Sequence, residues 1–413
     1  MTMVTPASHP KALIAVLAAC LVLPLAAALT PATGNASAHS PDVNDIILSI
    51  NESFIEDSIA AIQAFGPHPT GSEACTRVRD YLTQRLEAWG LEVYLHGWSR
   101  RSYQGQNIVA TWPGIHAELP PVVVSAHYDS APGSPGADDD GSGVASVLAA
   151  ARALREYSFN RTVAFVLFSG EEQGTLGSLS YVHDLYHQGK QVAGVINLDG
   201  IGHTETESGG RNVIVYEEPA SAWLADAMEE VASDHYQQVR LGLKRLPNTG
   251  YSDHNSFLTY GYGALQVEEY EYNHWFHTAN DTLDYVNVTY VTHIARLTAG
   301  TLARVAHQNW RTPEVTIAVP RHDVLYVFGR ELLPLDRGTV LALGPLDMVA
   351  EASADTASVT FYLDGEAVAV DEEPPFSWTC RRTLLWDHQM VAEARDAQGN
   401  VAVAQVDLGL SLY

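Results

Sequence analysis

Short, continuous apolar segments alternate along the chain with segments whose apolar residues recur every three or four positions. The first kind is typical of strands buried on both faces, and the second kind is typical of helices. The predicted strands span residues 122–126, 162–168, 192–198 and 264–267. The predicted helices span residues 42–65, 72–90, 143–156, 177–188, 220–234 and 290–308. This alternation predicts an α/β fold, with a mixed, mostly parallel sheet flanked by helices.

The pattern changes near Pro313, beyond which the sequence has no helical spacing. The segment "SVTFYLDGEAVAV" alternates apolar and polar residues on both sides of Asp364 and Gly365, which is a strong hairpin signal. The segment "HQMVAEARDAQGNVAVAQVDL" repeats this arrangement. We therefore expect an α/β domain over residues 39–312, followed by a small all-β, immunoglobulin-like sandwich domain over residues 313–413.

The first 38 residues have the pattern of an export signal. Lys11 precedes an apolar run from Ala12 to Leu29, and the small residues Ala36–Ala38 follow it. We expect cleavage near Ala38, which would make the protein secreted or extracytoplasmic. Two alternatives stay open: an uncleaved N-terminal segment that tethers the protein to a membrane, and lipidation at Cys20 within "LAAC".

The overall composition is that of a globular protein, with 46% hydrophobic and 17% charged residues among 413. The formal net charge of −26 argues against nucleic-acid binding, which needs a basic surface. Without the signal, only Cys75 and Cys380 would remain, too few for a disulfide framework. No later apolar run approaches the ~18 residues of a membrane span, so we expect a soluble body.

Histidines and carboxylates follow the predicted strands at the points where the strands end. Ligands of parallel sheets bind beyond the carboxyl ends of the strands, so these side chains are expected to meet at one edge. The candidates are His127, Asp129, Asp139, Glu171, Glu172, Asp199 and His277. Two imidazoles with three or four carboxylates form a ligand set that suits zinc, and a pair of zinc ions needs one bridging carboxylate. Asp139 suits the bridging role because the glycines around it let the backbone approach closely.

Several longer strings of residues repeat the pattern of a known family. They are "AHYDS", "PGADDDGSG", "SGEEQGTLGS", "NLDGIG", "YSDH" and "HTANDT", and they lie within residues 46–308. Their order and spacing resemble those of the co-catalytic dizinc aminopeptidases, a family that includes bacterial leucyl aminopeptidases, glutamate carboxypeptidase and glutaminyl cyclases. The resemblance implies the phosphorylase/hydrolase-like fold of the zinc exopeptidases and two zinc ions per chain.

The resemblance also implies which residues hold the two ions. His127, Asp139 and Asp199 would hold one zinc ion. Asp139, Glu172 and His277 would hold the other, so that Asp139 bridges the pair.

The same resemblance implies the residues that act in catalysis. Glu171 would be the general base, and Asp129 would accept a hydrogen bond from the far nitrogen of His127 and orient its ring. Tyr251, just before "SDH", corresponds to the family's oxyanion partner. In the family the peptide bond after the bridging aspartate is often cis, which here would be the Asp139–Asp140 bond.

Other polar residues near these strings have simpler interpretations. His254 is expected to be structural or to support a ligand, and Asp138 and Asp140 are expected to be loop residues rather than ligands. Three acids of the later loop either receive the α-ammonium group of a substrate or form an exposed acidic surface; they are Glu268, Glu269 and Glu271.

The function expected from these observations is that of a secreted dizinc metallo-exopeptidase, which removes N-terminal residues from peptides or proteins. A carboxypeptidase or dipeptidase on the same scaffold is the main alternative. A glutaminyl cyclase-type acyltransferase is disfavoured because that type loses the first histidine ligand, and His127 is present. An inactive binding ectodomain is disfavoured because Glu171 and the full ligand set are present. The C-terminal domain is expected to dock on the catalytic domain or to act as a spacer, and binding of cell wall or carbohydrate stays open as an alternative.

Overall fold

The computed structural model describes residues 41–307, 313, 315–335, 338–397, 399 and 401–413, which belong to one compact unit. The expected export signal lies outside the described residues. Among those described, no helix is both long and apolar enough to cross a membrane. Cys75 and Cys380 are both buried and are not joined by a disulfide.

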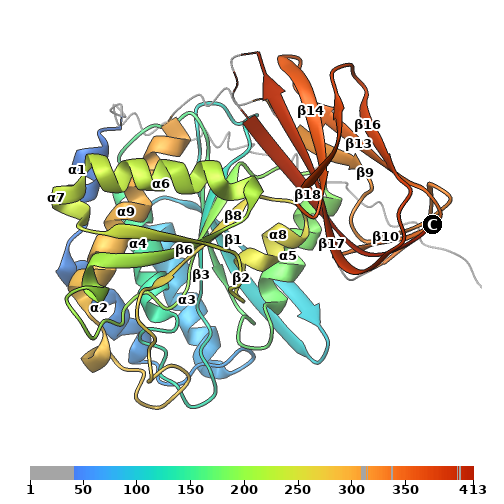
Figure 1. Ribbon diagram of the computed structural model, residues 1–413. Coiled ribbons are helices and arrows are strands. Elements are labelled where there is room, and N and C mark those ends of the chain that lie inside the picture. Colours follow the sequence, from blue (N-terminus) through green and yellow to red (C-terminus); the bar gives the residue numbers. More distant parts are fainter. Residues whose placement is uncertain (1–40, 308–312, 314, 336–337, 398, 400) are drawn as a thin grey trace, which may run out of the picture. The chain divides into compact units, whose positions relative to one another are not determined.

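The larger part of the unit contains an eight-stranded sheet of order β1-β2-β4-β3-β5-β8-β6-β7 (Figure 1). The strands are β1 (Glu92–Arg100), β2 (Tyr103–Trp112), β3 (Val122–His127), β4 (Val163–Phe168), β5 (Gly194–Leu198), β6 (Asn212–Glu217), β7 (Gly242–Pro247) and β8 (Ala264–Glu269). The four central strands, β4, β3, β5 and β8, run parallel. Their carboxyl ends therefore share one edge, and the predicted mixed, mostly parallel sheet is confirmed.

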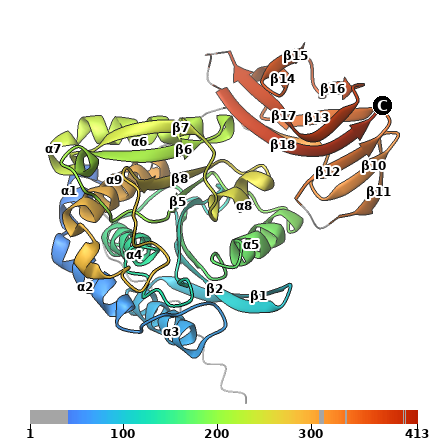
Figure 2. The same ribbon diagram turned by 60° about the horizontal axis from the view of Figure 1, so that its bottom comes forward.

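Helices cover both faces of this sheet. They are α1 (Val43–Ser49), α2 (Glu52–Gln63), α3 (Glu73–Ala88), α4 (Gly141–Leu154), α5 (Leu176–His187), α6 (Ala222–Asp234), α7 (Tyr236–Val239), α8 (His254–Thr259) and α9 (Val288–His307), with 3-10 turns at Gly209–Arg211, Pro219–Ser221 and Leu283–Tyr285. Helices α4 and α9 lie on one face and α5 and α8 on the other (Figure 2). Successive side chains of β4 accordingly enter two separate cores, Phe165 and Leu167 in one, Val166 and Phe168 in the other.

Two predictions for the first helices have different outcomes. Ser72 caps α3, because its Oγ accepts a hydrogen bond from the main-chain N–H of Cys75 at 3.0 Å. The single helix predicted over residues 42–65 is wrong, since the structure has α1 and α2 there. Ile50 has an extended backbone, and the Asn51 side chain accepts the N–H of Phe54 at 3.0 Å and so starts a second helix.

The described residues after α9 form two sheets and no helix, as the change of pattern predicted. A seven-stranded sheet has the order β11-β10-β12-β18-β17-β14-β15, and a three-stranded sheet has the order β16-β13-β9. The strands are β9 (Val315–Val319), β10 (Val324–Val327), β11 (Arg330–Pro334), β12 (Val340–Leu343), β13 (Leu346–Ala352), β14 (Thr356–Leu363), β15 (Glu366–Asp371), β16 (Phe376–Cys380), β17 (Leu384–Asp396) and β18 (Val401–Leu412).

Both predicted hairpins are antiparallel strand pairs, β14 with β15 and β17 with β18. The turn between β14 and β15 has positive φ at Asp364 and Gly365, as a two-residue hairpin turn requires. The domain boundary at residues 312 and 313 and the immunoglobulin-like class of the second part stay predictions.

Candidate metal centre

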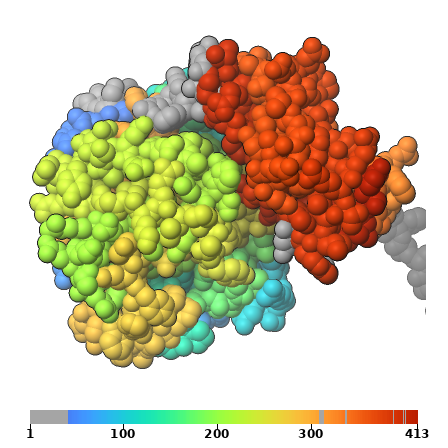
Figure 3. Space-filling model, in the orientation of Figure 1, coloured from blue at the N-terminus to red at the C-terminus, as the bar shows by residue number. Residues whose placement is uncertain are grey.

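The five predicted zinc ligands lie together at the carboxyl edge of the central strands. His127 ends β3, Asp199 follows β5, Glu172 follows β4, and Asp139 lies two residues before the start of α4. His277 comes from the loop after β8, which lies at the molecular surface (Figure 3), and its side chain is 51% exposed. Loops after parallel strands therefore bring together residues as far apart in the chain as 127 and 277.

These residues form two groups that share Asp139. In one group, His127 Nε2 lies 3.1 Å from Asp139 Oδ1 and 3.6 Å from Asp199 Oδ1. In the other, His277 Nε2 lies 3.1 Å from Asp139 Oδ2 and 3.1 Å from Glu172 Oε2. One carboxylate oxygen of Asp139 thus faces each group, which is the arrangement of a bridging carboxylate.

One buried oxygen of this cluster, Glu172 Oε1, lacks a hydrogen-bond partner among the described residues. A buried oxygen without a partner is costly, and a bound cation would satisfy it. The two groups also offer two imidazoles and three carboxylates within 4.8 Å of one another in each group, a donor set that suits zinc. The residues present therefore fit two zinc ions.

The charged groups of this cluster shift one another's pKa values. Hydrogen bonds to Asp139 and Glu172 raise the pKa of His277 to about 10. Burial acts to raise the pKa of Asp139, but hydrogen bonds to His127 and His277 outweigh it and lower this pKa to about 2. Burial, together with nearby carboxylates that include Asp139, raises the pKa of Glu171 well above its usual value. A carboxylate that readily holds a proton suits general acid–base chemistry.

Asp140 belongs to neither group of ligand atoms among the described residues, and its buried side chain holds three segments together. Its Oδ2 accepts the main-chain N–H of His127 at 3.0 Å, and its Oδ1 accepts the N–H groups of Gly143 at 3.1 Å and Gly200 at 3.3 Å. It thereby caps α4 and ties that helix to the ends of β3 and β5. The peptide bond between Asp139 and Asp140 is cis, as the family resemblance implies.

Asp138 also has a structural role. Its main-chain N–H is held by Asp281, a residue that the sequence analysis missed. Asp138 accepts the N–H of Gly202 at 2.7 Å and the amide of Asn273 at 2.6 Å. Asp281 accepts the main-chain N–H of Asp138 at 2.8 Å and that of Asp139 at 3.3 Å. Asp281 therefore holds the loop that carries the bridging residue. Asp281 lies in the string "HTANDT", and its place in that string is the sequence signal that could have pointed to it.

Asp129 contacts His127 in a different way from the one expected. His127 Nδ1 lies 2.9 Å from the main-chain oxygen of Asp129 and 3.6 Å from its carboxylate, so the main-chain oxygen is the acceptor. The carboxylate instead accepts hydrogen bonds from Thr70 Oγ1 at 2.9 Å and from the main-chain N–H of Glu171 at 3.4 Å. Asp129 thus orients the first histidine and also fixes the start of the segment that carries the glutamate pair.

Asp253, in the string "YSDH", is a second residue that the sequence analysis missed. It is fully buried, its two carboxylate oxygens have no hydrogen-bond partner among the described residues, and it raises the pKa of Glu171. Burial raises its own pKa to about 7. The adjacent His254 lies 2.9 Å from Asn248 Oδ1 through Nε2, which agrees with the structural role expected for it.

A cavity of about 310 Å³ opens beside the first ligand group and includes Asp199 in its wall. Tyr251 also lines this cavity, with a side chain that is 78% exposed, rather than lying among the ligands. The lining also includes acidic and aromatic side chains; they are Glu268, Glu269, Tyr216, Tyr272 and Phe276. The wall of the cavity therefore carries both acidic and aromatic side chains.

The mostly parallel α/β sheet, with two zinc-type ligand groups at its carboxyl edge, agrees with the class of zinc-dependent metallopeptidases that the resemblance implies. Residues 107–302 match the family model described as Peptidase family M28. This match and the relatives that follow confirm the resemblance seen in the sequence and indicate a zinc-dependent aminopeptidase, a hydrolase.

Individual known proteins resemble this chain in sequence or in fold. The chain is 28% identical to leucine aminopeptidase 1 of Aspergillus niger over 63% of this chain and 72% of that protein. It shares its fold with the LapA aminopeptidase of Legionella pneumophila, with a TM-score of 0.59 and 22% identity over 66% of this chain and 77% of that one. The zinc aminopeptidase BSAP of Bacillus subtilis superposes with a TM-score of 0.57 and 16% identity over 63% of this chain and 96% of that one.

Proposed function

We propose that this chain is a secreted dizinc exopeptidase that removes N-terminal residues from peptides. The observation that carries the proposal is the Asp139 carboxylate, which has one oxygen toward His127 and the other toward His277, each at 3.1 Å. His127, Asp139 and Asp199 would hold one zinc ion, with Glu172 and His277 completing the second group. When bound, the two ions would polarise the scissile carbonyl and make a water molecule acidic enough to attack it.

Glu171 would move the proton in this reaction. Burial and the surrounding carboxylates raise its pKa, so it accepts a proton from the attacking water more readily than an exposed glutamate. The same carboxyl group would then donate that proton to the leaving amine as the C–N bond breaks. Asp129 would support this step by holding the main chain at Glu171.

Glu268 is the best candidate for receiving the α-ammonium group of the substrate. Glu269 already accepts the main-chain N–H of His203 at 2.6 Å, and Glu271 accepts hydrogen bonds from Thr206. Glu268 lines the cavity, and burial raises its pKa to about 7. An ammonium group at this carboxylate would favour its ionised form and give the site its preference for free N-termini.

The aromatic wall of the cavity would accept a large apolar N-terminal side chain. Tyr251, at the rim of the same cavity, would be the hydrogen-bond donor to the carbonyl oxygen as negative charge develops on it. Its high exposure leaves it able to reach a bound substrate.

The proposal also includes export and a two-domain organisation. Helix α9 ends at His307 and β9 begins at Val315, on either side of the expected boundary between residues 312 and 313. This spacing supports a catalytic domain over residues 39–312 and a separate all-β domain after it.

A panel of aminoacyl-nitroanilides with free and blocked N-termini tests the activity. We expect turnover only of substrates with a free α-amino group. Equal turnover of blocked substrates would contradict the aminopeptidase assignment, and release of C-terminal residues from peptides would favour the carboxypeptidase alternative.

A further inference from the structure

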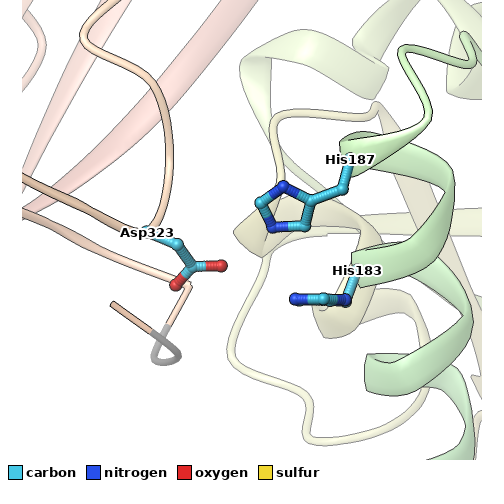
Figure 4. Close-up of side chains that lie close together, drawn as sticks. All are labelled: His183, His187 and Asp323. Atoms are coloured by element: carbon cyan, nitrogen blue, oxygen red, sulfur yellow. The ribbon is translucent and has the colours of Figure 1, made fainter. Parts of the chain in front are cut away.

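A second set of metal-type side chains lies outside the active site. His183 and His187 belong to α5, and Asp323 lies in the turn between β9 and β10. One ligand atom from each residue falls within 4.8 Å of the other two. Figure 4 shows both rings and the carboxylate pointing toward a common space.

His183 and His187 are four positions apart in α5, a spacing that allows both to bind one metal ion. Positions four apart lie on the same face of a helix, one turn above the other, and pairs of histidines at this spacing bind zinc in metalloproteins. The ring centroids of His183 and His187 are 4.3 Å apart.

The surrounding residues already orient two of the three ligands. His183 Nδ1 lies 3.2 Å from the Asp184 carboxylate, which leaves Nε2 to face the common space. A carboxylate at the far nitrogen is the usual support of a metal-bound histidine. Asp323 is buried and accepts hydrogen bonds from the Tyr260 hydroxyl at 2.6 Å and from the main chain of Gly338.

We propose that a zinc ion binds to His183, His187 and Asp323. Two imidazoles and one carboxylate supply three of the four ligands that zinc prefers, and a water molecule would complete the coordination. Nothing in the proposed peptidase mechanism uses these residues. Because α5 belongs to the α/β part and Asp323 to the all-β part, the ion would cross-link the two, in line with the docking role expected for the C-terminal strands.

Anomalous diffraction at the zinc edge, from crystals of the full chain equilibrated with micromolar free zinc, locates the ion directly. We expect a peak between the three side chains in addition to any peaks at the Asp139 centre. Absence of a peak at His183, His187 and Asp323 would overturn the proposal, whatever the Asp139 centre contains. The two sites are therefore tested separately.

Zinc content per chain gives a second measurement. The double variant His183→Gln/His187→Gln should bind one zinc ion fewer than the wild-type chain after dialysis against micromolar zinc, with unchanged peptidase activity. His116→Gln, in an exposed loop, is the matched control and should bind as much zinc as the wild type. Equal zinc contents in the wild type and the double variant would overturn the proposal.

Discussion

Glu171 and Glu172 are neighbours in the chain but have different surroundings. Glu172 Oε2 lies 3.1 Å from His277 Nε2, whereas Glu171 belongs to neither group of ligand atoms among the described residues. Its raised pKa comes from burial and from carboxylates, Asp199 first among them. Two identical side chains can therefore serve separately as a ligand and as a proton carrier.

The variant Glu171→Gln tests this division. Glutamine keeps the shape of the side chain but cannot take a proton from water, so kcat should fall by about 10²- to 10⁴-fold while the zinc content stays that of the wild type. Turnover with nitroanilides and elemental analysis measure the two quantities. Glu172→Gln is the control and should lose zinc. Retained activity in Glu171→Gln would remove Glu171 from its role.

The proposed recognition of the N-terminus depends on Glu268. In Glu268→Gln the ammonium group of the substrate loses its charged partner, so kcat/KM should fall about 10- to 100-fold, mainly through a higher KM. Steady-state kinetics with free aminoacyl substrates measure this split. Glu207→Gln removes an equal charge from an exposed position and should leave KM unchanged. An unchanged KM in Glu268→Gln would exclude Glu268 as the acceptor.

At the scale of the elements, the strands that are buried on both faces and apolar throughout were predicted from the sequence. Strands β3, β4 and β5 lie within a residue or two of the predicted ranges, because a strand buried on both faces is apolar throughout. Strands β1, β2, β6 and β7 were missed. The first two show why. They pair antiparallel at one end of the sheet, and β1 exposes Tyr94 and Leu95, so its pattern of polarity does not mark an inner and an outer face.

The candidate ligands were predictable because each follows a recognisable strand or string. Asp281 was missed because its role depends on contact with Asp139, 142 residues earlier in the chain. The hydrogen bond of His127 was assigned to the carboxylate of Asp129 because a sequence does not distinguish a side-chain oxygen from a main-chain oxygen. Local patterns thus predicted which residues meet, but not which atoms.

The loop that carries Asp139 depends on Asp281 for its position. Asp281→Asn leaves one acceptor oxygen and introduces N–H groups against the main-chain N–H of Asp138 or Asp139. We expect zinc affinity at the Asp139 centre to weaken about 10- to 100-fold, as losses of supporting residues commonly do. Competition with a zinc chelator measures it. Asp284→Asn, an exposed neighbour, is the control, and equal affinities in both variants would contradict the role of Asp281.

At the scale of the whole molecule, a buried histidine makes the fold sensitive to acid. Burial lowers the pKa of His254 from 6.5 to about 3. Between these values the unfolded chain binds more protons than the folded one, so the contribution of His254 to stability is complete above pH 6.5 and is lost as the pH falls toward 3. Between pH 6.5 and pH 4 this loss amounts to about 3 kcal/mol.

The variant His254→Gln removes this titrating group. Its free energy of unfolding should therefore fall by about 3 kcal/mol less than that of the wild type between pH 6.5 and pH 4. Urea unfolding of metal-free protein at the two pH values measures the difference without a contribution from zinc release. His116→Gln should follow the wild type, and parallel pH profiles for His254→Gln and the wild type would contradict the prediction.

The acids beside Asp139 have a consequence for how this part of the sequence can change in evolution. Their partners include glycine N–H groups, and a Cβ at Gly143 would lie 2.3 Å from Asp140, while one at Gly202 would lie 2.6 Å from Asp138. Each of these acids is therefore paired with a glycine, whose lack of a side chain leaves room for the carboxylate, and not with a basic residue. Across related sequences each acid should therefore persist or disappear together with its glycine, and a search for covarying acid–base pairs would pass over this coupling.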